Sequence, residues 1–303
     1  MNKIFNERNI KIGLIINWRF HKNNKWVSAL TPNLINEIIK TFNPLIISSK
    51  LKYLIYKSKL EYIISLEPGW AAPIIKFDKS KKHKIFVFIS DPHKKKDWLI
   101  NYVTLNNIDY ILSYYYHPFF FHFPDFPKEK VIHFPWAIPD ELINNEVISV
   151  RNNKVIIFGG KNNEAYDIRN WCRSQSGIIS FNNSGVENKT FTNIEYFKWL
   201  RKYDAIVAAG SSDPKFDLVT PKYFEIASSG SLLFAQYCRD LELLGFNNTN
   251  CVIFNKDNFN TLVSKYKSNP EGYIELRKNG INLIRSNHTI SERIKLLKKF
   301  IEC

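Results

Sequence analysis

The residues best suited to chemistry lie in one polar segment, Asp217 to Thr220, and in the helix predicted to follow it. Pro221 suits the first position of that helix, because the amide hydrogen that proline lacks would have no partner there. The N–H groups of the first turn and the helix dipole form an anion site, to which Lys222 adds a positive charge. Glu225, one turn further, can accept hydrogen bonds from a diol such as a ribose. A phosphate site beside such a carboxylate is what a nucleotide-linked substrate requires.

A second candidate for phosphate binding is a glycine turn. Residues 154–158 predict a buried strand that ends in Gly159, Gly160 and Lys161. Glycines let the backbone approach a pyrophosphate closely, although a plain tight turn is the alternative. The turn is not a GxGxxG motif, which argues against a dinucleotide-binding dehydrogenase. Ser211, in the loop after the strand predicted at 205–208, would face the same site.

A family resemblance appears in residues 224–230. The order Phe-Glu-Ile-Ala-Ser-Ser-Gly resembles the F-E-x-x-A-x-G signature of group 1 glycosyltransferases, which have two Rossmann-like domains in the architecture called GT-B. It is most similar to the short, spore-maturation-protein-like branch, in which a basic residue precedes the Phe-Glu pair with one residue between, as Lys222 does here. The resemblance implies that Glu225 contacts the ribose, and that Lys222, Thr220 and the glycine turn hold the diphosphate. Asp217 resembles the first acid of the E-x7-E pattern, although the family has Glu there.

Two further segments fit this family. His288 to Arg293 resembles the H-T-x-x-x-R segment that opens the last helix, which implies a C-terminal helix that crosses back to the first domain. We predict Ser291 as the N-cap of that helix and a structural role for His288. Residues 217–222 also resemble an element of α1,3-fucosyltransferases, another GT-B family, so the donor sugar stays open.

Catalytic candidates come from the first half of the chain. Asp91 and His93 directly follow the clearest strand there, residues 84–89, at the end where parallel sheets bind ligands. A carboxylate and an imidazole two residues apart can act as a base and its orienting partner. The spore-maturation-type relatives carry a similar D-x-H after a strand. The alternative is a turn in which Asp91 caps the next helix and His93 is solvated.

Composition narrows the class of protein. No apolar run reaches the roughly 18 residues of a membrane span, no secretory signal is present, and the four cysteines lack CxxC or zinc-like spacing. We therefore expect a cytoplasmic protein with reduced thiols. The GT-B resemblance implies that the protein needs no metal and no cofactor, since the nucleotide sugar is its substrate. The net charge of +15 attracts polyanions, unless it only reflects drift toward Lys, Asn and Ile. No nucleic-acid-binding motif is recognisable, so we expect an anionic membrane surface and no nucleic acid.

Strand-like and helix-like segments alternate along the chain, which predicts an α/β fold. The length allows two domains of about 150 residues. Residues 144–153 are polar without periodicity and serve as the predicted linker. We therefore divide the chain into residues 1–148, an N-terminal acceptor-side Rossmann-like domain, and residues 149–303, a donor-binding domain. Ligand-binding strand ends of the two domains would face each other across a cleft.

The family resemblance, with these observations, implies a metal-independent glycosyltransferase that moves sugar from a nucleotide-activated donor to a glycan or lipid-linked hydroxyl acceptor. Two rivals remain: a basic, non-catalytic Rossmann-type polyanion-binding protein, and a nucleotide-sugar epimerase of GT-B fold. The aromatic block at 114–123 fits a membrane interface, an acceptor-sugar platform or domain core. Localisation at the membrane would then be peripheral.

Overall fold

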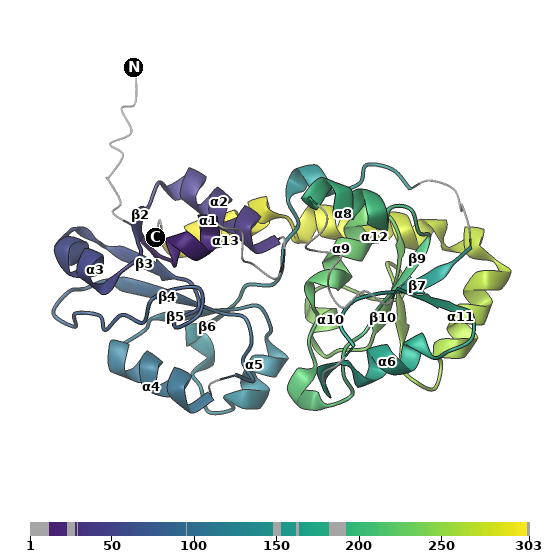
Figure 1. The fold of residues 1–303 in the computed structure, drawn as a ribbon, viewed down its shortest axis with the longest axis horizontal. Coiled ribbons are helices and arrows are strands. Elements are labelled where there is room, and N and C mark those ends of the chain that lie inside the picture. Colours follow the sequence, from purple (N-terminus) through teal and green to yellow (C-terminus); the bar gives the residue numbers. More distant parts are fainter. Residues whose placement is uncertain are drawn as a thin grey trace, which may run out of the picture.

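The computed structural model describes residues 12–22, 28, 30–94, 96–147, 153–161, 164–181 and 192–301. They form two α/β domains joined side by side (Figure 1). The predicted boundary between residues 148 and 149 lies outside the described residues and stays a prediction. No helix among the described residues is long and apolar enough to cross a membrane.

The first domain has a six-stranded parallel sheet in the order β2-β1-β3-β4-β5-β6. Its strands are short and almost fully buried, as expected when helices cover both faces of a sheet. The elements are β1 (Ile12–Ile15), α1 (Trp18–Lys22), α2 (Leu30–Phe42), β2 (Leu45–Ile47), α3 (Lys50–Tyr56), β3 (Tyr62–Ser65), β4 (Lys84–Ile89), α4 (Lys96–Asn106), β5 (Tyr110–Ser113), α5 (His117–His122) and β6 (Val131–His133).

The second domain has a five-stranded parallel sheet in the order β11-β10-β9-β7-β8. Its elements are β7 (Val155–Ile157), α6 (Asp167–Arg173), β8 (Ile178–Ser180), α8 (Asn193–Leu200), β9 (Ala205–Ala208), α9 (Pro221–Ser229), β10 (Leu232–Gln236), α10 (Asp240–Leu243), β11 (Val252–Phe254), α11 (Phe259–Ser268), α12 (Ile274–Asn287) and α13 (Ile290–Ile301). The predicted pair of Rossmann-like domains is thus confirmed.

The last helix, α13, crosses back to the first domain as predicted (Figure 1). The ring of Phe300 packs against Phe86 and Tyr110, and Lys84 Nζ donates a hydrogen bond to the Phe300 carbonyl (2.9 Å). The predicted N-cap is wrong by two residues. The Thr289 hydroxyl accepts from the Glu292 amide (3.1 Å), whereas the Ser291 hydroxyl donates to Asp140 of the first domain (3.0 Å).

The aromatic block is mainly core. Four of its side chains are buried, and a fifth, Phe121, is exposed; the buried ones are Tyr114, Tyr115, Phe119 and Phe123. The indole of Trp136 stacks on Tyr114 with ring centroids 4.1 Å apart. A surface that binds membranes must therefore be sought elsewhere.

Arg293 forms hydrogen bonds with both segments through which the chain passes between the domains. Its guanidinium donates to the carbonyl of Pro135 (2.7 Å), to the carbonyl of Asn287 (2.9 Å) and to Nδ1 of His288 (2.7 Å). Nε2 of His288 donates to the carbonyl of Leu244 (2.8 Å). His288 is therefore buried and neutral. Burial, with the charge of Arg293, lowers its pKa to about 3.

This arrangement predicts a loss of stability in acid. The pKa of His288 is about 3 in the folded protein against 6.5 for the free group. Between those values the unfolded chain binds the extra proton, so the free energy of unfolding falls as pH falls, by about 1.4 kcal/mol per pH unit for this residue. Urea unfolding of wild type and His288→Gln at about pH 7 and about pH 5 measures this change in the free energy of unfolding. The free energy of unfolding should fall more between about pH 7 and about pH 5 in the wild type than in His288→Gln. An equal fall in both proteins would refute a buried, neutral His288.

Candidate functional site

The glycine turn and the start of α9 lie together in the second domain. Lys222 Nζ donates to the carbonyl of Phe158 (2.8 Å) and lies over its ring, 3.7 Å from the centroid. Gly159 has a φ of +105°, and a Cβ there would collide with Lys222 Nζ. The sequence predicted this proximity. The turn favours glycine because its φ lies in a region that residues with a Cβ rarely adopt, and a side chain there would also displace the lysine amine.

The start of α9 has the predicted geometry. Thr220 is the N-cap in extended conformation, Pro221 occupies the first turn, and Gly230 ends the helix with a left-handed φ of 81°. The side chain of Lys222, in the first turn, thus reaches the glycine turn. This combination of helix terminus, cation and close backbone is suited to a phosphate.

Glu225 is buried one turn deeper, with 2 % of its surface exposed. The Tyr196 hydroxyl on α8 donates to its Oε2 (2.8 Å). Burial raises the pKa of Glu225, while the Tyr196 hydrogen bond and the charge of Lys222 oppose that rise. Tyr196 thus fixes the carboxylate orientation through one oxygen.

Two arginines of α6 hold the glycine turn. Arg173 Nη2 donates to the Gly159 carbonyl (2.6 Å), and Arg169 Nη1 donates to the Gly160 carbonyl (3.3 Å). Arg169 is buried, its Nε donates to the Ala209 carbonyl (2.8 Å), and its guanidinium stacks on Tyr166, 4.0 Å from the ring centroid. The turn is therefore fixed in place and surrounded by positive charge. Lys161, next along the chain, is half-buried at the edge of this turn.

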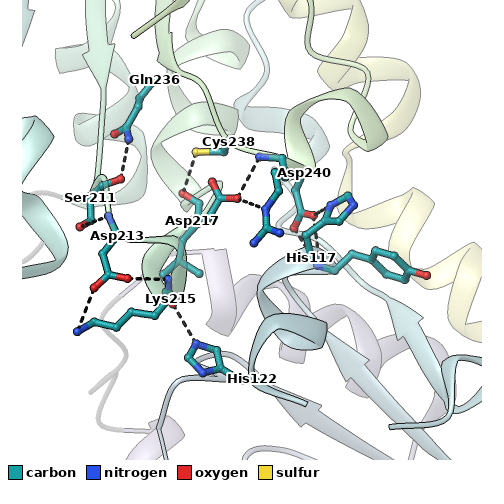
Figure 2. Close-up of polar contacts among 12 residues, drawn as sticks. His117, His122, Ser211, Asp213, Lys215, Asp217, Gln236, Cys238 and Asp240 are labelled. Atoms are coloured by element: carbon teal, nitrogen blue, oxygen red, sulfur yellow. Dashed lines mark hydrogen bonds and ion pairs between the residues drawn. The ribbon is translucent and has the colours of Figure 1, made fainter. Parts of the chain in front are cut away.

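Ser211 lies in a loop that neighbouring strand ends hold rigid. Gln236, at the end of β10, accepts from the Gly210 amide (2.7 Å) and donates to the Ser211 carbonyl (2.7 Å), as Figure 2 shows for Ser211. The Ser211 hydroxyl donates to the Glu164 carbonyl (3.0 Å). The loop after β9 is thus joined to the segment that follows the glycine turn.

Asp217 has a partner of its own. Its Oδ2 accepts from Nε of Arg239 (2.8 Å) and from the Arg239 amide (3.3 Å). Figure 2 shows this carboxylate pointing toward the chain that follows β10. In this structure Asp217 therefore fixes the loop before α9, and a contact with a donor sugar would need that ion pair to loosen.

Asp91 and His93 lie at the carboxyl end of β4 but contact different groups. The Asp91 carboxylate forms an ion pair with Lys94 (2.7 Å). The His93 ring meets Phe216 of the second domain edge-to-face, with centroids 5.0 Å apart. Its Nδ1 is buried with no hydrogen-bond partner among the described residues, and burial lowers its pKa. His93 is therefore half-buried at the junction of the domains, with a lowered pKa that favours the neutral imidazole. Its role as a base, against that of a helix-capping turn, stays a prediction.

The domains also touch through α5. Asp240 of α10, fully buried, accepts from the backbone amides of Tyr116 (2.8 Å) and His117 (2.9 Å) and pairs with His117 Nδ1 (2.7 Å; Figure 2). Nε2 of His122 donates to the Lys215 carbonyl (3.0 Å). These contacts bring α5 of the first domain close to the loops of the second domain.

Comparison with protein families identifies the family to which the chain belongs. A family model described as "Glycosyl transferase-like" matches residues 147–299, which is 153 of the 303 residues. The chain belongs to this glycosyltransferase family. The match covers the glycine turn, α9 and the last helix, on which the resemblance rested. The finer assignment to the spore-maturation-protein-like branch stays a prediction.

Solved structures extend the likeness over both domains of this glycosyltransferase. A glycosyltransferase from Rickettsia africae is similar over 97% of this chain and 98% of its own, with 12% identity and a TM-score of 0.59. HepE of Anabaena, solved in complex with UDP and glucose, is similar over 96% and 98%, with 8% identity and a TM-score of 0.60. A sucrose-phosphate synthase from Thermosynechococcus elongatus is similar over 83% of this chain and 76% of its own, with 8% identity and a TM-score of 0.56. No curated protein sequence matches the chain significantly.

Several residues of the candidate site were not predicted from the sequence. Arg169 and Arg173 stand four apart just after the glycine turn, so one helix face carries both, and that spacing was a usable signal. Tyr196 and Gln236 reach the site from α8 and β10, and no sequence signal pointed to them. Lys94 follows His93 directly, and its charge was visible, but its pairing with Asp91 required the fold.

Proposed function

We propose that this glycosyltransferase binds a nucleoside-diphosphate sugar at the glycine turn and the first turn of α9. The observation that carries the proposal is Lys222 Nζ lying directly against Gly159 beside that helix terminus. The diphosphate would contact Gly159, Gly160, Lys161 and Lys222, with Thr220, Pro221 and Ser211 shaping the pocket. Glu225 would accept hydrogen bonds from the ribose through the oxygen that Tyr196 does not occupy.

The leaving diphosphate gains negative charge as the glycosidic bond breaks. Lys222, the α9 terminus and the arginines behind the turn would stabilise that charge in fixed positions, without reorganisation during the reaction. We therefore keep metal-independent transfer as part of the proposal. Among the described residues no group of three or more His, Cys, Asp or Glu side chains is placed to hold a metal ion.

The acceptor would bind on the first domain. We propose a glycan or lipid-linked hydroxyl as acceptor, with His93 or Asp91 taking its proton during attack on the anomeric carbon. The lowered pKa of His93 keeps its imidazole neutral near pH 7, as a base requires. Association with an anionic membrane would bring the protein to a lipid-linked acceptor.

A panel of nucleotide sugars tests the proposal. Uridine-diphosphate sugars come first, because HepE was solved with UDP and glucose. We expect one donor class to raise the melting temperature saturably, and to release nucleoside diphosphate when acceptor is present. Stabilisation with a change of sugar but no acceptor would indicate the epimerase instead. Binding of any polyanion alike, with no turnover, would support the basic binding protein.

Lys222→Ala should weaken binding of the nucleoside diphosphate by roughly ten-fold or more, because a charge-assisted contact to phosphate is lost. Binding of the free nucleoside should barely change. The loss should shrink as salt rises, since ions screen exposed charges. Isothermal titration at low and high salt measures both, with Lys198→Ala, an exposed lysine of α8, as matched control. A loss equal for nucleoside and diphosphate would make Lys222 structural.

A further inference from the structure

Helix α3 carries an apolar face that points away from the core. Leu51, Leu54 and Ile55 are 67%, 56% and 59% exposed. Residues three and four apart share a helix face, so the three side chains form one patch. The opposite side of α3 is anchored by Tyr53, which is buried and packs edge-to-face on Phe77.

A surface helix normally turns its polar side to water and its apolar side to the core. Here Tyr53 alone of the helix is buried, while the two leucines and the isoleucine meet solvent. Single exposed apolar residues are common, but a contiguous patch of large ones marks a surface that binds something. We call this patch, with the lysines around it, the α3 surface.

Lysines surround the patch. Residues 50–59 contain four lysines and no acidic residue. Among them, Lys50 and Lys59 are exposed. A neighbouring loop adds three more exposed lysines, Lys79, Lys81 and Lys82.

The loop is fixed against α3 and η1 (Lys57–Lys59) by two contacts. Lys57 Nζ pairs with Asp78 (2.6 Å), and the Tyr53 hydroxyl accepts from the Asp78 amide (2.9 Å). The ion pair neutralises the charge of Asp78, the one acidic residue at the start of the loop, so the α3 surface as a whole is strongly positive. The loop and the helix thus form one surface and not two unrelated charged segments.

We propose that the α3 surface docks this protein on an anionic lipid bilayer. Leu51, Leu54 and Ile55 would enter the headgroup–acyl boundary, while the lysines contact anionic headgroups. Apolar insertion and lysine attraction are the two contributions by which interfacial helices bind. The inference deepens the proposed membrane association by naming its surface, and it does not depend on the identity of the donor.

Two other occupants fit less well. Nucleic acid would match the lysines but would leave the three apolar side chains without an apolar partner. A second copy docked through the same surface would place lysine against lysine, because a two-fold contact brings identical patches together. An anionic bilayer satisfies both the apolar and the positive parts of the surface.

The position of α3 suits this role. Figure 1 shows α3 at the edge of the first domain that lies away from the second domain. Docking there leaves the donor-binding loops of the second domain uncovered. It also places the acceptor-side domain against the membrane, where a lipid-linked acceptor would lie.

Co-sedimentation with vesicles tests the inference. Wild type should bind vesicles of phosphatidylglycerol and phosphatidylcholine, and bind pure phosphatidylcholine at least ten-fold more weakly. Leu51→Ser/Leu54→Ser should lower partitioning into anionic vesicles by about ten-fold or more, because two inserted leucines are lost. Lys81→Glu/Lys82→Glu should lower it as well, and more strongly at low salt. Leu105→Ser/Leu243→Ser, which changes two leucines that are 61% and 54% exposed elsewhere, is the matched control.

Each contrary outcome is distinct. Equal binding to both vesicle types, no binding, or loss of binding in the control variant but not in the α3 variant would overturn the inference. A dimer in sedimentation equilibrium that Leu51→Ser/Leu54→Ser dissociates would assign the surface to self-association. Donor-induced stabilisation, measured on the same variants, should stay unchanged, so a failure here is separate from a failure of the proposed transferase site.

Discussion

Turnover should fall by about 10²- to 10⁴-fold when the acceptor-side base is removed, while affinity for the donor stays within a few-fold. The variants are His93→Ala and Asp91→Asn. His93 lies at the domain junction with a buried Nδ1 and a lowered pKa, and Asp91 lies beside it, paired with Lys94. The residues that we propose to bind the donor lie in the other domain, so their contacts should survive both changes.

The pH profile separates a base from a structural histidine. A base with a lowered pKa stays deprotonated below the usual range of histidine, so kcat/KM of wild type should hold to below pH 6.5 and then fall. His122→Gln is the matched control, because its ring lies 6.2 Å from that of His93 and its hydrogen bond goes to a backbone carbonyl. If His93→Ala and Asp91→Asn both turn over as wild type does, the base belongs to another loop of the first domain.

Replacing Glu225 should strongly weaken the binding of the nucleotide donor. Hydrogen bonds to a charged group contribute about 1.5–3 kcal/mol each, so losing the carboxylate that accepts from the ribose should weaken nucleoside diphosphates by roughly 10²-fold. Glu225→Ala and the isosteric Glu225→Gln are compared by isothermal titration. Circular dichroism and thermal unfolding verify that each variant is folded, since the side chain is buried.

A nucleotide without ribose hydroxyls provides the control for the predicted role of Glu225. Wild type should prefer a ribonucleoside diphosphate to its 2′,3′-dideoxy analogue, and Glu225→Gln should lose most of that preference. Tyr196→Phe should reduce it partly, because Tyr196 orients the carboxylate through Oε2. Equal affinity of wild type and Glu225→Ala for the ribonucleotide would remove Glu225 from the site.

The parts of the site that sequence predicted are those with local causes. Pro221 and Gly230 begin and end α9 because their backbones favour those positions. Gly159 turns the chain after β7 for the same kind of reason, and the burial of each strand follows from its apolar run. The two-domain fold followed from the alternation of such elements.

The parts that sequence could not supply depend on residues distant in the chain. Tyr196 reaches Glu225 across 29 residues, and Asp240 reaches His117 across 123. Asp217 resembles the first acid of the E-x7-E pattern, yet Arg239 lies against it, which only the path of the chain after β10 determines. Ser291 was a reasonable cap by type, but Thr289 lies one position before the helix and Asp140 takes the serine hydroxyl.

The most direct test of the central claim is a crystal structure of this glycosyltransferase with the best-binding nucleoside diphosphate. We predict the diphosphate between the Gly159–Gly160 turn and the first turn of α9, within hydrogen-bond distance of Lys222 Nζ, with the ribose hydroxyls on Glu225. A nucleotide bound elsewhere, or one whose diphosphate contacts neither the turn nor α9, would contradict it.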